Sequence, residues 1–405
     1  MSWNYVRLGD VCSKIGSGAT PKGGATVYID SGISLIRSQN VYNLEFSYDG
    51  LAHITEDAAE KLNGVTVLKN DILLNITGDS VARTCIVPDS VLPARVNQHV
   101  AIVRPNQKEV NPLFLNYYLA SPYMQSFMLG LAVGKGASRN AMTKDMIANF
   151  EVPCPPIDIQ ESIVSILSAY DNLIENNQKQ IKLLEEAARR LYKEWFVDLR
   201  FPGYEDTPIV DGVPEGWEEA PIDSRISLLS GYAFKSAQFD SSGEYKIVTI
   251  KNVKDGEFDG INTNRIVSIP GKTPKHCVLT DGDILLSLTG NVGRTCIVNG
   301  NNYLLNQRVA KLQSDIPAFT YCLFRSSDMF DAMNNLANGT AQQNLSPIRT
   351  GKISILFPAD NLLEEFERIV GSMISKMLSL IKQCDLLIQA RDRLLPKLIS
   401  GEIEV

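Results

Sequence analysis

The chain has 405 residues, of which 44% are hydrophobic, and this predicts a folded protein of two or more domains and excludes a largely disordered chain. It contains no run of about 18 apolar residues, and its first residues lack the basic and apolar regions of a secretion signal, so we expect a cytoplasmic protein without membrane contacts. The net charge of −7 argues weakly against nucleic acid, because contacts to phosphates need lysine and arginine.

Residues 1–156 are expected to form a first domain of mixed α and β structure. β-Branched and apolar residues gather there in segments bounded by Gly, Asn, Asp or Pro, which predicts strands at 65–74, 82–87 and 100–103. An apolar segment at 113–119 predicts a short helix.

A long amphipathic helix is predicted at 157–200. Its apolar residues recur mostly every three or four positions, which places them on one face of a helix. Asp158, with Glu161 three positions later, is expected to cap the first turn in the manner of a capping box. The Phe-Pro-Gly sequence at 201–203 is expected to stop the helix.

A linker rich in Pro, Gly and acidic residues is predicted at 201–216. Residues 217–358 are expected to form a second domain of the same mixed type. Its strands are predicted at 246–250, 283–288 and 294–298, and its short helix at 318–324.

A second long helix is predicted at 359–405, with Asn361 and Glu364 as its capping pair and Pro396 disturbing its last turn. Each helix has about 36–40 residues and is therefore roughly 54–60 Å long. A helix of this length with one apolar face needs a partner, which favours an antiparallel coiled coil between the two helices. The alternative is that each apolar stripe packs on its own domain.

The two domains are related by duplication. Asp71-Ile-Leu-Leu-Asn-Ile-Thr-Gly-Asp-Ser-Val-Ala-Arg-Thr-Cys-Ile-Val87 matches Asp283-Ile-Leu-Leu-Ser-Leu-Thr-Gly-Asn-Val-Gly-Arg-Thr-Cys-Ile-Val298, with one extra residue in the first copy. We therefore expect an α+β protein with two pseudo-symmetric domains and two long antiparallel coiled-coil helices that separate them. The match extends to Asn-Val at 40–41 and 252–253, to Asn-Gln at 97–98 and 306–307, and to Trp3 and Trp217 before the first strand of each domain.

Short sequences near the ends of the helices carry a resemblance to a known family. They are Pro155-Pro-Ile-Asp-Ile-Gln160, Glu194-Trp-Phe-Val-Asp-Leu-Arg-Phe-Pro-Gly203, Pro214-Glu-Gly-Trp-Glu218, Phe357-Pro-Ala-Asp-Asn-Leu-Leu-Glu-Glu365 and Arg393-Leu-Leu-Pro-Lys-Leu-Ile-Ser-Gly-Glu402. Each is weak alone, but their order and spacing are specific. With the duplicated layout, they make essentially the whole chain resemble the specificity subunit of type I restriction-modification systems.

The resemblance implies that each domain is a target recognition domain, which reads one half of an asymmetric, bipartite site on double-stranded DNA. It implies that the helices set the gap between the half-sites and dock two modification subunits, which bind S-adenosylmethionine and methylate adenine. A restriction subunit with motor and nuclease activity joins them for cleavage. The chain itself is then expected to be non-catalytic and to bind no cofactor.

Base edges are read by forked hydrogen bonds, from Arg or Lys to guanine and from Asn or Gln to adenine, so we looked for such side chains on loops. The alternative for each is a solvated turn residue, and Arg83 and Arg294 are equally suited to structural or phosphate contacts. In the first domain the candidates are Lys22, Arg37, Gln39, Asn40, Thr77, Asp79, Arg83, Lys135, Arg139 and Asn140. In the second domain they are Tyr232, Lys235, Lys251, Asn252, Thr289, Asn291, Arg294, Gln342 and Gln343.

The acidic residues are unevenly distributed. They are concentrated on the first predicted helix and at 201–223, a segment without lysine or arginine. The first domain is therefore close to balanced, whereas the second is more acidic and the interpretation as a DNA reader is weaker there.

Cysteine and histidine spacing indicates neither a metal site nor a disulfide framework. The seven cysteines include no Cys-x-x-Cys pair, and only three histidines occur. We expect reduced cysteines in the core and no metal bound by this chain.

Two other functions were weighed. A methyltransferase fused to a specificity protein would need the Asn-Pro-Pro-aromatic motif, which does not occur, and the glycine-rich segment 130–138 lacks the spacing of a phosphate loop. A coiled-coil scaffold or decoy that binds modification subunits without reading DNA would share the same helices, and it stays open at this point.

Overall fold

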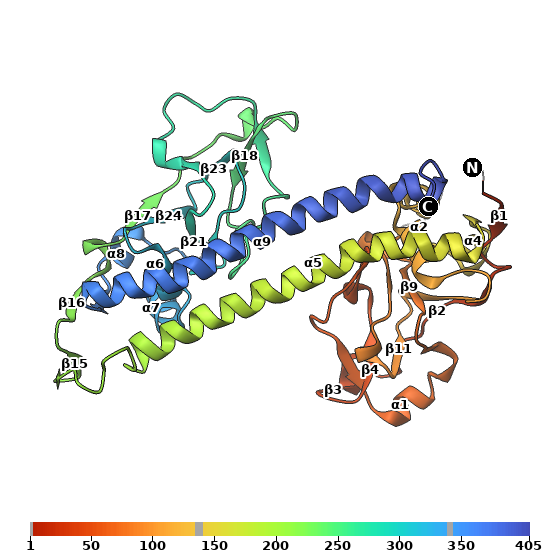
Figure 1. The fold of residues 1–405 in the computed structure, drawn as a ribbon, viewed down its shortest axis with the longest axis horizontal. Coiled ribbons are helices and arrows are strands. Elements are labelled where there is room, and N and C mark those ends of the chain that lie inside the picture. Colours follow the sequence, from red (N-terminus) through yellow and green to blue (C-terminus); the bar gives the residue numbers. More distant parts are fainter. Residues whose placement is uncertain (1–2, 134–140, 338–342) are drawn as a thin grey trace. The chain divides into compact units, whose positions relative to one another are not determined.

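The computed structural model describes residues 3–133, 141–337 and 343–405 (Figure 1). Contacts between residues divide the chain into two compact units. Unit 1 comprises residues 1–173 and 387–405, and unit 2 comprises residues 174–386. Each unit therefore contains one globular domain together with a part of both long helices.

The globular part of unit 1 is built on a four-stranded sheet, in the order β10-β9-β12-β2, and a five-stranded sheet, in the order β3-β7-β4-β11-β8. Two further pairs, β1 with β13 and β5 with β6, complete its strands. The elements are β1 (Tyr5–Arg7), β2 (Cys12–Ser17), β3 (Tyr28–Ile29), β4 (Ile33–Ile36), β5 (Val41–Tyr42), β6 (Glu45–Phe46), β7 (Ala52–Ile54), α1 (Glu56–Glu60), β8 (Thr66–Val67), β9 (Ile72–Asn75), β10 (Thr84–Ile86), β11 (Ala94–Val96), β12 (Val100–Pro105), α2 (Pro112–Ala120), α3 (Pro122–Ala132), α4 (Lys144–Ala148) and β13 (Glu151–Pro153).

The globular part of unit 2 is built on two four-stranded sheets, in the orders β17-β24-β21-β22 and β19-β18-β23-β20, with the pairs β14-β15 and β16-β25. Its elements are β14 (Ile209–Val210), β15 (Val213–Pro214), β16 (Glu218–Pro221), β17 (Ser227–Ser230), β18 (Tyr245–Val248), β19 (Asn264–Ile266), β20 (Val278–Leu279), β21 (Ile284–Ser287), β22 (Thr295–Ile297), β23 (Tyr303–Leu305), β24 (Val309–Gln313), α6 (Pro317–Phe324), α7 (Ser327–Ala337), α8 (Pro347–Gly351) and β25 (Ser354–Phe357).

The two units repeat one architecture. The sheet β10-β9-β12-β2 corresponds strand by strand to β22-β21-β24-β17, and helices α2, α3 and α4 correspond to α6, α7 and α8. In each unit one parallel pair, β4 with β11 or β18 with β23, lies among antiparallel strands. The prediction of an α+β protein with two similar domains is confirmed.

One predicted strand is divided in two. The segment 65–74 forms β8 and β9, separated by a turn in which Asn70 adopts a φ of 67°. The buried carboxylate of Asp71 holds this turn, because it accepts a hydrogen bond from the backbone N–H of Leu68 at 2.7 Å and two from Arg104 at 2.6 and 2.7 Å. Apolar pattern alone did not reveal the turn, since Leu68 continues the apolar run on its N-terminal side.

Both long helices are present, as α5 (Ile157–Tyr192) and α9 (Asp360–Ser400). α5 continues into a π-helical turn, Lys193–Val197, and α9 includes Pro396 without ending there. The predicted capping residues were wrong by two positions, because α5 begins at Ile157 and α9 at Asp360, so residues 156 and 359 precede the two helices. Asp158 therefore lies inside the first turn, where its negative charge still favours the positive end of the helix dipole.

The helices run antiparallel and are in contact within each unit. In unit 1, Arg391 of α9 donates to Asp171 of α5 at 2.6 Å. In unit 2, the Cys384 thiol of α9 lies 3.8 Å from the carbonyl oxygen of Ile174, and the rings of Tyr192 and Phe366 are 6.2 Å apart. Residue numbers thus rise along α5 as they fall along α9.

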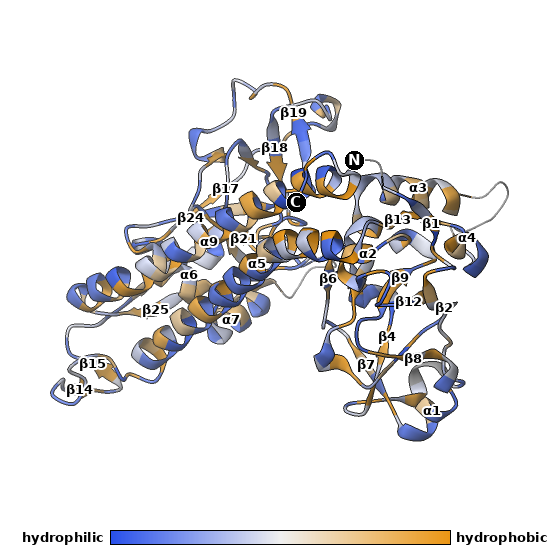
Figure 2. Cartoon of the chain, turned by 45° about the vertical axis from the view of Figure 1, so that its right-hand side comes forward, coloured by the Kyte–Doolittle hydropathy of each residue, from blue (hydrophilic) through white to orange (hydrophobic). Residues whose placement is uncertain are grey.

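The apolar stripes of the helices also pack on the domains. Ile163 and Leu167 of α5 and Leu398 of α9 belong to one buried cluster with the α2 residue Phe114. Figure 2 shows orange and blue faces along both helices, as expected for rods buried on one side. The two alternatives for the stripes, a helix–helix contact and a helix–domain contact, therefore occur together.

All seven cysteines are free thiols, and five of them are buried. Burial raises the pKa of the Cys12, Cys85 and Cys322 thiols to about 12, which keeps them protonated and unreactive. Over the described ranges, no helix combines the length and the apolar character that crossing a membrane requires.

Candidate nucleic-acid interface

The first segment of the candidate site in unit 1 is the turn that links β9 to β10. It includes a 3-10 turn, Gly78–Ser80, and it needs left-handed backbone at Gly78 (φ 75°) and Ala82 (φ 75°). Unit 2 makes the same turn with two glycines, Gly290 and Gly293. The turn places Thr77 and Asp79, or Thr289 and Asn291, at the end of the sheet.

The second segment is a short turn, of 3-10 type in unit 1, that is held by a buried asparagine in each unit. The Asn40 side chain accepts from the backbone N–H of Arg37 at 3.0 Å and donates to the carbonyls of Ser47 and Asp49. Asn252 makes the equivalent bonds in unit 2. Both are fully buried, so we assign them a role in shaping the loop and remove them from the set of base-reading candidates.

The third segment is the turn before β12, at residues 97–99, which lies against the end of β2. Gly18 is required there, because a methyl group at its position would overlap the backbone of residues 96–97. Gly231 meets the backbone of residues 305–306 in the same way in unit 2. The close approach of two chains therefore fixes where this turn lies in both units.

The three segments enclose an open cavity of about 600 Å³ in unit 1. Four of the predicted candidates line it, namely Gln39, Thr77, Asp79 and Arg83. Sequence reasoning missed the other polar lining residues: Ser38, Tyr42, Ser80 and His99. The duplication was the available signal, since Tyr42 and His99 directly adjoin matched residues and differ from their counterparts in the second copy.

The cavity offers hydrogen-bonding groups of several kinds in fixed positions. The Arg83 guanidinium lies 4.7 Å from the centre of the Tyr42 ring, and the Thr77 hydroxyl lies 2.6 Å from His99 Nδ1. Gln39 and Asp79 are exposed to solvent. A concave surface with donors, acceptors and one aromatic face suits the edges of bases and the adjoining phosphates.

Two further candidates of unit 1 do not line the cavity. Arg37 is tied down, because its Nη2 donates to the Gly50 carbonyl at 2.5 Å and its guanidinium lies 5.6 Å from the centre of the Tyr28 ring. Lys22 is exposed in the turn that follows β2. Arg37 thus supports the loop, and Lys22 is accessible to a ligand.

Unit 2 presents its candidates on the same three segments and on the chain that follows β17. Lys251 and Asn291 are exposed, and Thr289 and Arg294 are half-buried. Tyr232 pairs through its backbone with residues 305 and 307, and its ring lies 5.1 Å from that of Phe234. Lys235 is exposed directly before a 3-10 turn, Ser236–Gln238.

Four candidates, Lys135, Arg139, Asn140 and Gln342, lie outside the described residues. The chain that follows them is described, and it reaches the same place in both units. Ala141 forms a β-bridge with Thr77, and Asn344 forms one with Thr289. Gln343, the neighbour of Asn344, is exposed.

The charges of the two surfaces differ in a direction that the domain compositions did not predict. At five equivalent positions unit 1 has one cation and one carboxylate, whereas unit 2 has four cations. The surface of unit 2 is thus the more cationic one, although its domain is the more acidic. The pairs are Gln39 and Lys251, Tyr42 and Lys254, Asp79 and Asn291, Arg83 and Arg294, and His99 and Arg308.

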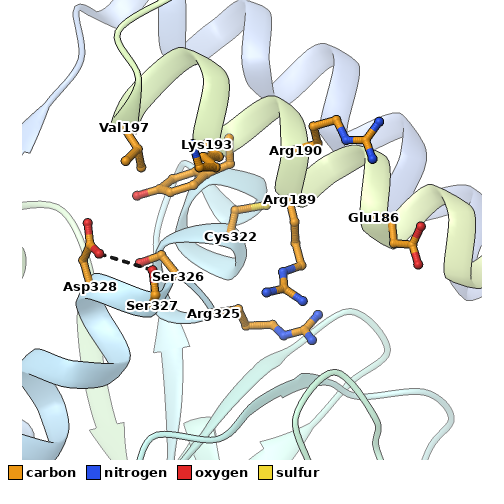
Figure 3. A pocket seen from close by; sticks show the side chains of 11 residues that line it. Glu186, Arg189, Arg190, Lys193, Val197, Cys322, Arg325, Ser326, Ser327 and Asp328 are labelled. Carbon is orange, nitrogen blue, oxygen red and sulfur yellow. Dashed lines mark hydrogen bonds between the residues drawn. The ribbon is translucent and has the colours of Figure 1, made fainter. Parts of the chain in front are cut away.

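A second cavity, of about 370 Å³, lies in unit 2 between the end of α5 and the junction of α6 and α7 (Figure 3). Four cations line it, Arg189, Arg190, Lys193 and Arg325, and two of them form ion pairs. Arg325 pairs with Glu185 and with Asp255, the latter at 3.0 Å, and Lys193 pairs with Asp198. The cavity lies at the junction between helix α5 and the domain.

Comparisons with known proteins agree with this arrangement. The family profile for the type I restriction modification DNA specificity domain matches residues 1–186 and 214–373, once for each unit. The chain belongs to this family. Among its relatives is the type I restriction enzyme MjaIX specificity subunit of Methanocaldococcus jannaschii, which is 24% identical over all of this chain and 94% of its own length.

Two further members extend the comparison. The HindI specificity subunit of Haemophilus influenzae is 21% identical to this chain, and the alignment covers 99% of each of the two chains. The crystal structure of the type I restriction-modification S subunit from M. genitalium aligns with a TM-score of 0.58 at 16% identity, over 98% of this chain and 96% of the other. The type I specificity fold is therefore shared along the whole chain.

Proposed function

We propose that this chain is the DNA-reading subunit of a type I restriction-modification complex, in which each unit reads one half of a bipartite, asymmetric site on double-stranded DNA. The observation that carries the proposal is the pair of equivalent surfaces. They share a backbone and differ in side chains, as in Gln39 and Lys251 or Asp79 and Asn291. One scaffold with two sets of side chains suits two different half-sites bound with one geometry.

The proposed organisation assigns residues 1–156 and 217–358 to the two recognition domains and 201–216 to the linker. The spacer helices are 157–200 and 359–405. Support for a spacer role comes from α5, which is continuous while its first part belongs to unit 1 and its second part to unit 2. We propose that these helices set the gap between the half-sites.

The helices are also the proposed docking surface for two modification subunits. Large apolar side chains remain exposed on them, including Leu173 and Leu183 on α5 and Leu386 on α9. Exposed apolar patches of this kind mark protein interfaces. In this proposal the modification subunits bind S-adenosylmethionine and methylate adenine, a motor-nuclease subunit joins them for cleavage, and this chain performs no chemistry itself.

Methylome sequencing tests the proposal. The gene would be placed, together with the gene of its modification subunit, in a host without adenine methylation. We expect methylated adenine at one motif with two separated half-sites. Methylation without a motif, or methylation that does not need this chain, would contradict the proposal. A complex that forms and leaves DNA unmethylated would instead identify a scaffold or decoy.

A second arm tests the spacer role. One helical turn would be inserted in α5 within residues 178–189, with a matched turn in the facing part of α9 to keep their contacts. A turn adds about 5.4 Å, which corresponds to one or two base pairs. We expect the gap between the half-sites to lengthen while their sequences stay the same. Changed half-site sequences would overturn the spacer role.

A further inference from the structure

One position lies at the same place in both surfaces and carries a different side chain in each. It is His99 in unit 1 and Arg308 in unit 2, each two residues after the first residue of the matched Asn-Gln pair. The His99 carbonyl accepts the Ile76 N–H at 3.0 Å, and the Arg308 carbonyl accepts the Leu288 N–H at 3.0 Å. The backbone therefore starts both side chains from equivalent points.

In unit 1 the imidazole is held in place at the wall of the cavity. The Thr77 hydroxyl lies 2.6 Å from Nδ1, and Gln98 Nε2 lies 3.3 Å from Nε2. The ring shares the cavity with Gln39, Asp79 and Arg83. Thr77 occupies Nδ1, so the ring meets a base through Nε2, where the base takes the place of the exposed Gln98 amide. One ring nitrogen, which either donates or accepts, matches only some base edges.

In unit 2 the equivalent residue is Arg308, which is exposed. Its guanidinium forms no ion pair with any residue that the structure describes. The absence of a histidine at this position coincides with a second difference between the units. The hydroxyl of Thr289, the counterpart of Thr77, is buried without a hydrogen-bond partner among the described residues. Unit 2 thus has a threonine at the position of Thr77 but no imidazole to bond its hydroxyl.

The side chains at the other equivalent positions of unit 2 suit DNA as the partner of Arg308. Arg294 and Lys251 add positive charge, which suits the phosphates beside a groove, and Asn291 adds an exposed amide. A guanidinium presents donors in a fork that matches O6 and N7 of guanine. Its counterpart in unit 1 has neither this fork nor a permanent charge.

We infer that His99 and Arg308 are equivalent specificity-determining residues, each of which reads one base pair of the half-site bound by its own unit, with Arg308 selecting guanine. This inference rests on the proposed function. The inference names, within that function, the position in each unit at which the two half-sites are distinguished.

The test uses the complex of this chain with its modification subunits and a set of duplexes in which each base pair of the motif is changed singly. Affinities would be measured by competition at one fixed salt concentration. Arg308→Ala is expected to lose roughly ten- to hundredfold discrimination at one G·C pair of one half-site, the range for a lost bidentate contact. His99→Ala is expected to lose discrimination at one base pair of the other half-site.

The exchange variant sharpens the prediction. His99→Arg is expected to shift the preference at its base pair towards guanine and to leave the other half-site unchanged, so that each variant contains its own control. Lys69→Ala, at the opposite end of β9 and 67% exposed, removes a cation from unit 1 and is expected to change no preference. Melting temperatures of the variants check that all of them fold.

The outcomes separate the two levels of the proposal. Unchanged discrimination by all of these variants, or uniform weakening at every base pair, would overturn the inference and leave the proposed function intact. A wild-type complex that shows no bipartite preference would remove the proposed function itself. Loss of discrimination at single, different base pairs supports both.

Discussion

Units 1 and 2 share one architecture, and they differ most where each is fixed to the long helices. In unit 1 the Tyr117 hydroxyl of α2 donates to Asp171 of α5, which also accepts from Arg391 of α9 at 2.6 Å. In unit 2 Arg325 ties the domain to α5, since it pairs with Glu185 of α5 and with Asp255, while Glu367 of α9 accepts from backbone N–H groups at the start of α6.

The difference has a consequence for the reading surfaces. Asp255 lies three residues after Asn252, in the loop that follows the turn held by that asparagine, so Arg325 ties this loop directly to α5. The equivalent loop of unit 1 is held by Asn43, which donates to Gln125 of α3 at 3.2 Å. Duplicated domains have therefore kept their sheets and replaced their connections to the helices.

Breaking the connection in unit 2 is expected to have the largest effect on stability. The Arg325 side chain is 3% exposed, and Arg325→Leu leaves Glu185 partly buried without its partner. We expect a loss of about 3 kcal/mol, at the lower end for breaking a buried ion pair because Asp255 is solvent-exposed. Chemical denaturation measures the loss, and hydrogen exchange should rise in peptides around residues 253–258 and not in unit 1.

A surface pair of unit 2 provides the control for that prediction. Lys352 and Asp223 lie 2.7 Å apart and are largely accessible, so Lys352→Ala is expected to cost less than about 0.5 kcal/mol. A similar loss in the two variants would show that burial of Arg325 does not matter.

The connection in unit 1 is expected to contribute less to the free energy of unfolding than the connection in unit 2. Asp171→Asn keeps the shape of the side chain but removes the charge that Arg391 faces, and Arg391 is 13% exposed. We expect a loss of about 2 kcal/mol, confined to unit 1. Burial, together with the Asp171 charge, raises the pKa of Tyr117, so its hydroxyl stays a donor, and Tyr117→Phe should cost about half as much. Equal exchange increases in both units would argue against two separate anchors.

Exchanging a residue of the reading surface tests the difference in chemistry. Gln39→Lys gives unit 1 the residue that unit 2 has at Lys251, and both positions are exposed. We expect roughly a tenfold change of preference in one half-site, since an amide suits adenine and an ammonium suits guanine. Methylome sequencing of the variant gives the readout, and the reverse change, Lys251→Gln, should alter only the other half-site.

A matched pair of threonines gives a further difference between the two units. The buried Thr84 hydroxyl donates to Asn116 at 3.0 Å, whereas the equivalent Thr295 hydroxyl is buried without a partner among the described residues. Thr84→Val should cost about 1–2 kcal/mol because Asn116 loses its donor, and Thr295→Val should be neutral or slightly stabilising. Equal losses in denaturation experiments would mean that the hydroxyls are equivalent.

Duplication made most of the fold predictable from the sequence. Both long helices and the strands around 71–87 and 283–298 were found because they carry strong apolar patterns twice. The turn at Asn70 was not, since it depends on side chains that bond after folding, such as Asp71 with Arg104. Periodicity does not register such bonds.

The candidate site was predictable in part for the same reason. Loops that follow matched strands pointed to Gln39, Thr77, Asp79 and Arg83, which all line one cavity. The internal role of Asn40 was hidden, because an asparagine in a loop looks the same whether its amide faces solvent or the backbone of residues 47 and 49. His99 was missed because the search for forked side chains did not include histidine, although its place after the matched Asn-Gln pair was a signal.

Unit 1 is made of two separate stretches of chain, and this affects the order in which the units can complete their folding during synthesis. The buried cluster of its domain includes Leu395, Leu398 and Ile399, and the Trp3 indole donates to the Ile399 carbonyl at 2.9 Å. Unit 2 is one continuous stretch of chain, 174–386. During synthesis the chain therefore contains a complete unit 2 before residues 387–405, which close the core of the domain made first, have been added.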